Sequence, residues 1–155
     1  MLVYTDGTVL LSHSAVEMGQ GVNIKMIQVA AQAFGIAPHA VRIAECSSDR
    51  CINTSPTAAS MGADLNGMAT LHGCEQIRAR LAPLIAEFPD DTFAQLCKKA
   101  YKRQISLSAV GFYASPYGGA CVLCCVVLCA VSFDLPRALA PLTLTESHFF
   151  PPPRL

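Results

Sequence analysis

The stretch Glu17-Met18-Gly19-Gln20-Gly21 holds the residue types best suited to binding chemistry. Its two glycines allow the backbone to turn sharply and to come close to a ligand. Gly21 precedes a helical pattern, and the N–H groups and positive dipole end of a helix N-terminus suit an anion such as phosphate. Gln20 offers two donors and an acceptor, which suits an amide-rich heterocycle. Because short glycine motifs are common, spacing alone favours a plain strand-to-helix turn.

A second candidate is the loop at residues 53–60, which reads Asn-Thr-Ser-Pro-Thr-Ala-Ala-Ser. Small residues such as Ala59 would let backbone amides approach a ligand, and the hydroxyl groups would supply adaptable hydrogen bonds. The simpler interpretation is a loop that leads into a helix, with Ser60 as the helix N-cap.

Turn residues and periodicity predict the elements that would position these two stretches. Asp6-Gly7 lies between two apolar runs, which predicts a β-hairpin over residues 2–11. A largely buried helix over residues 22–34, ended by Gly35, is followed by a strand over residues 41–46. Strand, glycine turn, helix and strand is the order of a βαβ unit with parallel strands.

Further elements follow the second candidate loop. Apolar residues at spacings of three and four, the last of them Leu84, predict a helix that starts near residue 63 or 64 and has Pro83 in its end region. The same pattern predicts a helix over residues 93–101, with an aspartate cap at position 90 or 91. Residues 105–109 alternate in polarity, as a half-buried strand does.

The chain divides into two unlike parts. The predicted elements give residues 1–118 an α+β fold, a mixed sheet with packed helices. From residue 119 the character changes, because residues 120–133 hold no charge and several prolines follow. Residues 119–155 contain only four charged side chains. We interpret residues 119–155 as an ill-defined hydrophobic, proline-rich tail that is unrelated to the preceding domain.

Bulk composition argues against several classes of protein. The 155 residues are 52% hydrophobic, enough for a sizeable core, and eleven basic residues balance eleven acidic ones. Without a basic stripe, no nucleic-acid partner is expected. The N-terminus lacks the basic and apolar regions of a secretory signal, so we expect a cytoplasmic protein with reduced cysteines.

Isolated metal-ligating residues point to no metal centre of their own. Four cysteines crowd into the tail, at Cys121, Cys124, Cys125 and Cys129. A structural zinc site needs four ligands on separated turns, and the surrounding residues are apolar. The uncharged run is shorter than the roughly 18 residues of a spanning helix, which disfavours a membrane anchor. We interpret His13, His39 and His72 as surface or hydrogen-bonded histidines.

Taken in this order, the stretches resemble the molybdopterin-binding region of the molybdenum hydroxylase family, of the xanthine dehydrogenase type. They match the pterin-binding turn and its helix, the loop and helix beside the molybdenum centre, and a later strand. The matching stretches are residues 17–21, 25–30, 53–60, 63–67, 106–109 and 111–113. Together they cover about residues 2–117.

The resemblance implies a set of site residues and a chemistry. It implies that Met18, Gly19 and Gln20 contact the molybdopterin. It also implies that the Ala59 backbone lies against the molybdenum, with Ser60 near the cofactor. The complete enzyme would hydroxylate a purine and pass electrons through iron–sulfur clusters and FAD, which we expect only in regions this chain lacks. The family is homodimeric, and its glutamate base has no counterpart here, so no catalytic residue is assigned.

Two positions depart from the family pattern. Ser14-Ala15 stands where the family usually has two glycines, and Cys51-Ile52 where it usually has Val-Pro.

From the resemblance we expect a fragment of a molybdenum-dependent oxidoreductase that supplies molybdopterin contacts and is inactive alone. The alternatives are a non-catalytic module that associates with a full-length homologue or another protein, and a tail-anchored membrane protein.

Overall fold

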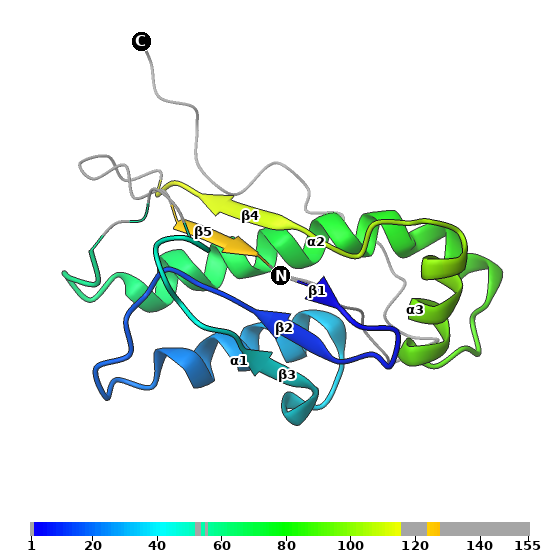
Figure 1. Cartoon of the computed structure of the whole chain (residues 1–155), viewed down its shortest axis with the longest axis horizontal. Helices are drawn as coiled ribbons and strands as arrows, with labels where there is room; N and C mark the ends of the chain where they lie inside the picture. The colour runs from blue at the N-terminus through cyan, green and yellow to red at the C-terminus, as the bar shows by residue number, and fades with distance from the viewer. Residues whose placement is uncertain (1, 52–53, 55, 116–123, 128–155) are drawn as a thin grey trace, which may run out of the picture.

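The computed structural model describes residues 2–51, 54, 56–115 and 124–127 (Figure 1). Within them it has three α-helices and two small β-sheets, so the predicted α+β class is confirmed. The long helix α2 (Gly62–Glu87) contacts the helix α1 on one face and the second sheet on another. No helix among the described residues is long and apolar enough to cross a membrane.

The first sheet is mixed, with strand β2 (Val9–Leu11) at its centre. Strand β1 (Leu2–Val3) pairs with it antiparallel, and strand β3 (Val41–Ile43) pairs with it in parallel. The predicted hairpin is therefore confirmed. Its turn needs a single left-handed residue, Gly7 at φ 87°, whose N–H donates to the carbonyl of Tyr4 at 3.1 Å.

The βαβ unit forms as the glycine turn predicts. Helix α1 spans Val22–Phe34, and Gly35, at φ 61°, ends it in the left-handed conformation that glycine adopts without strain. The parallel pairing of β2 with β3 completes the unit, although β3 is shorter than the predicted strand at 41–46. Lys25, Gln28 and Gln32 are polar and exposed on α1.

Helix α2 ends at Glu87, so Pro83, which the sequence places in the end region, lies inside the helix, one turn before its last residue. A proline inside a helix loses one backbone hydrogen bond and clashes with the preceding turn, at a cost of about 3 kcal/mol. Pro83 itself is exposed, whereas the next residue, Leu84, is fully buried. Burial of the Leu84 side chain in the core offsets part of this cost and favours one more turn of helix.

Helix α3 (Phe93–Lys102) has Thr92 as its N-cap, not the predicted aspartate. The backbone N–H and the hydroxyl of Thr92 both donate to Gln95 Oε1, each at 2.7 Å. Asp91 pairs instead with Lys99 Nζ at 2.5 Å. A threonine followed three residues later by glutamine is the sequence signature of a capping box, and it was the stronger signal.

The strand predicted at 105–109 does not form, and these residues pair with no strand among the described residues. The guanidinium of Arg80 on α2 donates to the carbonyls of Ser106 and Ser108, at 2.9 and 2.7 Å. A helix side chain thus satisfies carbonyls that a neighbouring strand would otherwise bind. Strand β4 (Val110–Tyr113) begins directly after this segment.

Strand β4 is held on both of its edges. On one edge it pairs antiparallel with strand β5 (Cys124–Val127). On the other, Gln76 Nε2 of α2 donates to the Val110 carbonyl at 3.0 Å, and His72 Nδ1 lies 2.9 Å from the Phe112 carbonyl oxygen. Positions 72, 76 and 80 follow one another at intervals of one helical turn. Side chains on one face of α2 therefore form hydrogen bonds with the backbone of the segment from 106 to 112.

Strand β5 lies within the segment interpreted from the sequence as an unrelated tail. It contacts both β4 and α2. The rest of residues 119–155 lies outside the described residues, including Cys121 and Cys129 of the cysteine cluster. The boundary at residue 118 and the unrelated character of the tail therefore stay predictions. Across the described ranges, no group of three His, Cys, Asp or Glu side chains is placed to hold a metal ion.

Candidate functional site

The glycine turn is organised by the carboxylate of Glu17. Its Oε1 accepts hydrogen bonds from the N–H groups of Gly19 at 3.0 Å and Gly21 at 2.8 Å, and its Oε2 accepts one from Asn23 N–H at 3.1 Å. These backbone bonds, that from Asn23 foremost, hold the pKa of Glu17 below its ordinary value. The N–H groups of Gly21 and Asn23 at the start of α1 thus bond the chain's own carboxylate, as in the plain strand-to-helix turn that spacing alone favours.

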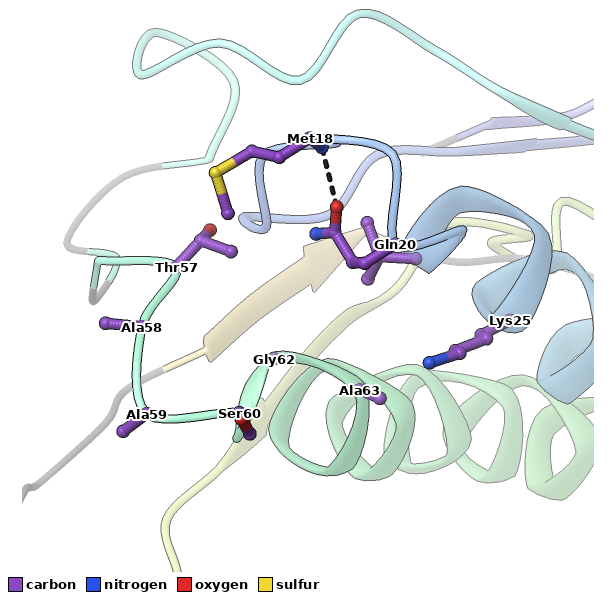
Figure 2. A pocket seen from close by; sticks show the side chains of 10 residues that line it. Met18, Gln20, Lys25, Thr57, Ala58, Ala59, Ser60, Gly62 and Ala63 are labelled. Carbon is purple, nitrogen blue, oxygen red and sulfur yellow. Dashed lines mark hydrogen bonds between the residues drawn. The ribbon is translucent and has the colours of Figure 1, made fainter.

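The side-chain amide of Gln20 closes the same turn (Figure 2). Its Oε1 accepts from Met18 N–H at 2.6 Å, and its Nε2 donates to the Val16 carbonyl at 2.8 Å. Both left-handed residues of the turn are glycines, Gly19 at φ 102° and Gly21 at φ 75°. An amide has two donors and two acceptor lone pairs, so Gln20 keeps one of each for a ligand.

The loop before α2 contains two residues in a costly backbone conformation. Ala59 and Ser60 have φ values of 54° and 56°, in the left-handed region. Residues with a Cβ pay roughly 1 kcal/mol or more each to adopt it, and such strain concentrates at functional sites. Ser60 is not the helix cap that the sequence predicted, because the N-cap position is Met61 and no side chain caps it.

These two stretches face each other across a pocket of about 390 Å³ (Figure 2). In the close-up the side chain of Met18 extends from the turn toward Thr57 on the opposite loop. Four of the five predicted site residues line this pocket, and Gly19 lies in the turn without lining it. The full lining is Met18, Gln20, Val22, Lys25, Thr57, Ala58, Ala59, Ser60, Gly62 and Ala63.

The pocket has a positively polarised wall. Lys25 reaches in from α1 and is the one ionisable side chain among the described residues that line the pocket. On the facing side, Gly62 and Ala63 belong to the first turn of α2, where the helix dipole is positive. Lys25 lies four residues after Gly21, one turn into α1, so this exposed side chain faces the same side as the glycine turn.

A buried histidine contacts the first turn of α1, directly after the glycine turn. His13 is fully buried, and its Nε2 lies 2.8 Å from Asn23 Oδ1 in the first turn of α1. Its Nδ1 is buried without a hydrogen-bond partner. Burial lowers the pKa of His13, and it outweighs the opposite effects of Asn23, Glu17 and the Ala15 backbone. The interpretation as a hydrogen-bonded histidine is confirmed for His13, but only for one of its two ring nitrogens.

The departure at Ser14-Ala15 does not strain this backbone. Neither residue has a positive φ, so neither position requires glycine. Ala15 is buried, and Ser14 is half-buried. At the second departure Cys51 is buried, whereas Ile52 lies outside the described residues.

Comparison with known proteins identifies the family. Residues 1–136 match the family model described as the molybdopterin cofactor-binding domain. The chain belongs to this family. It is 55% identical over 114 residues to xanthine dehydrogenase of Drosophila pseudoobscura pseudoobscura, covering 74% of the chain and 8% of that protein. It is 51% identical over 117 residues to xanthine dehydrogenase of Dictyostelium discoideum, covering 76% and 9%.

The matched region is also similar to an enzyme with another name. Nicotinate hydroxylase of Emericella nidulans is 48% identical over 115 residues, covering 74% of the chain and 8% of that protein. The chain thus spans less than a tenth of the length of these relatives. The resemblance to the molybdopterin-binding region of xanthine dehydrogenases is confirmed, while this region alone does not separate xanthine dehydrogenases from nicotinate hydroxylase.

Proposed function

We propose that this chain forms part of the molybdopterin site in a molybdenum-dependent oxidoreductase of xanthine dehydrogenase type. The observation that carries the proposal is the pocket that joins the Glu17–Gly21 turn to the loop at 57–63. Its volume of about 390 Å³ lies in the range of small-molecule and cofactor sites. The family match over residues 1–136 supports the same cofactor.

The donor set fits a pterin carrying an anionic group. Met18, Gly19 and Gln20 would hold the molybdopterin, with the remaining amide donor and acceptor of Gln20 directed at the heterocycle. Small side chains at Ala59 and Ser60 leave their backbone open to the molybdenum end of the cofactor. Lys25 and the start of α2 would favour negative charge. When bound, the group would supply molybdenum and its redox chemistry.

The chain is inactive on its own in this proposal, because the described residues that line its pocket include no suitable general base. Glu17 is the acidic residue beside the pocket, but its carboxylate accepts three backbone N–H bonds and its pKa is lowered. A base must bind the proton it removes, and this environment favours the unprotonated form. The complete enzyme would hydroxylate a purine in the cytoplasm, as a homodimer, with iron–sulfur clusters and FAD in regions outside this chain.

The cofactor content of a completed chain tests the proposal. The chain is joined to the remaining regions of a xanthine dehydrogenase, and bound molybdopterin is measured as its fluorescent oxidation product. Gln20→Ala should lower the molybdopterin content, whereas the matched variant Gln32→Ala, in an exposed position of α1, should not. Equal content in both variants would remove the case for a site at the glycine turn. The chain alone should form no urate from xanthine, and urate formation would refute its inactivity.

A non-catalytic binding module is the second candidate, and exposed apolar side chains favour it. Ile24 and Tyr101 are 62% and 71% exposed, and Phe112 is 43% exposed. A contiguous group of such side chains would form a surface that another protein or domain covers, whereas single exposed apolar side chains are ordinary on a monomer. Cofactor content separates the two functions, because a binding module would associate with its partner without retaining molybdopterin.

A further inference from the structure

Beneath the pocket, a buried asparagine joins the two walls. Asn66 lies in α2, one turn after Gly62, and is 4% exposed. Its Oδ1 accepts hydrogen bonds from the backbone N–H of Ser14 at 3.2 Å and from the Ser14 hydroxyl at 2.9 Å. Its Nδ2 donates to the Gly62 carbonyl at 2.8 Å. One amide group thus contacts the segment before the glycine turn and the first residue of α2.

We propose that Asn66 is a positioning residue that sets the spacing between the two walls of the pocket, through a latch formed by Ser14 and Asn66. The role assumes the cofactor site proposed above, but the latch itself can be tested without the cofactor. Ser14 and Asn66 are 52 positions apart in the sequence, so this contact links segments that the local chain does not hold together.

The orientation of the Asn66 amide is fixed by its neighbours. A backbone N–H can only donate and a backbone carbonyl can only accept. Ser14 N–H therefore requires the amide oxygen, and the Gly62 carbonyl requires the amide nitrogen. Neither an aspartate nor a leucine of similar size could satisfy both partners, so the position is specific for asparagine among side chains of this length.

The segment that the latch holds is not part of any regular element, because residues 14–21 belong to no helix or strand. The hydrogen bonds of Glu17 and Gln20 lie within the turn or reach the start of α1, so they do not fix its distance from α2. A hydrogen bond to the facing loop comes from the N–H of Val16, which donates to Thr57 Oγ1 at 2.8 Å. Ser14 and Val16 thus hold the turn at two points just before Glu17. The hydroxyl half of the latch also depends on Ser14, where the family pattern has a glycine that offers no side chain.

Hydrogen exchange of the full chain, followed by mass spectrometry, tests the latch. In Asn66→Ala, exchange should rise about tenfold in peptides covering 14–21 and 57–63, as expected when the hydrogen bonds of one buried side chain are removed. Exchange in α3 should not change. Ser14→Ala, which keeps its backbone bond, should show a smaller rise in the same two peptides, and Ser14→Thr should restore the wild-type rates.

Thr70→Ala is the matched control. Thr70 lies one turn further along α2, is fully buried, and its hydroxyl contacts Met26 Sδ at 3.6 Å without reaching the turn. It should raise exchange in α1 and α2 but leave 57–63 unchanged. The latch is refuted if Asn66→Ala and Ser14→Ala leave both walls unchanged, or if they raise exchange uniformly along the chain, as plain destabilisation would.

Retention of molybdopterin tests the positioning role separately. The full chain is mixed with molybdopterin without oxygen, passed through gel filtration and assayed for the fluorescent oxidation product. Asn66→Ala should retain several-fold less than Thr70→Ala. Equal retention, combined with local exchange changes, would refute positioning. If the wild-type chain retains none, the proposed function loses its support, while the exchange experiment still decides whether the latch exists.

Discussion

Gly111 of β4 lies with its backbone directly against the carbonyl of Ala69 in α2. A Cβ built on Gly111 would lie 1.8 Å from Ala69 O and 2.9 Å from Gly73 N, far inside van der Waals contact. This close approach brings β4 near enough for His72 and Gln76 to reach its backbone polar groups. The absence of a side chain at position 111 is therefore what allows the strand to pack on the helix.

Adding a methyl group at Gly111 should strongly destabilise the fold. Because both clashing atoms belong to the α2 backbone, Gly111→Ala should lower the free energy of unfolding by about 3 kcal/mol or more, the upper end for overpacking. Gly67→Ala is the control, since its Cβ would meet only Met26 Cε and Val29 Cγ2 at 3.9 Å. It should stabilise α2 by up to about 1 kcal/mol. Urea unfolding measures both, and equal stability of Gly111→Ala and wild type would contradict the packing.

Local sequence patterns predicted the helices and strands that end at a local signal such as a glycine. Glycine at position 35 and the apolar period of residues 22–34 were sufficient for α1, and the glycine turn was sufficient for the βαβ order. The last residue of α2 was not predicted, because proline acts locally, whereas the burial of Leu84 is a tertiary effect. The alternation at 105–109 predicted a strand that does not form, because polarity cannot reveal that Arg80 binds these carbonyls in place of a strand.

The sequence predicted which residues belong to the candidate site, but it did not predict the electrostatics of that site. Residue types and resemblance brought together Met18, Gln20, Ala59 and Ser60, which the structure places around one pocket. The start of α1 was interpreted as suited to an anion, because the sequence does not show that Glu17 folds back onto those N–H groups. The latch beneath the pocket depends on a contact across 52 positions, which no local pattern encodes.

The stability of the chain should fall as the pH decreases from about 7 to 5, because of His13. Burial lowers the pKa of His13 from its ordinary value of 6.5. The unfolded chain therefore takes up a proton near pH 6.5 while the folded chain does not, so acid favours unfolding below that pH. His13→Gln removes the titration and keeps an amide near Asn23. Its urea midpoint should change less over this range than that of wild type, and identical slopes would contradict the assignment.

The glycine turn should loosen at lower pH, through Glu17. Its carboxylate has a lowered pKa, so its contribution to stability is complete above the ordinary value of 4.5 and is lost as the pH falls through the lower folded value. Glu17→Gln should give faster amide exchange at Gly19, Gly21 and Asn23 at neutral pH, and a weaker response of these amides to acid. Glu75→Gln, an exposed position on α2, is the control and should change neither property.

Truncation separates the role of β5 from that of the rest of residues 119–155. A chain that ends after residue 127 keeps β5 and loses a proline-rich apolar segment, so its soluble yield should rise. A chain that ends after residue 117 also loses β5, and the edge of β4 that faced it is left unpaired. Its Tm should fall by roughly 4 °C or more relative to the longer truncation, as a loss of about 1 kcal/mol produces in a domain of this size.

The comparison of the two truncated chains decides where the domain ends. An unpaired strand edge invites association with other chains, so the shorter chain should also aggregate more at equal concentration, which light scattering measures. If the chain ending after residue 117 is as stable and as soluble as the longer one, β5 adds nothing to the fold, and the boundary at residue 118 is correct. If it is less stable, the domain extends at least through Val127, because the pairing of β4 with β5 then contributes to its stability.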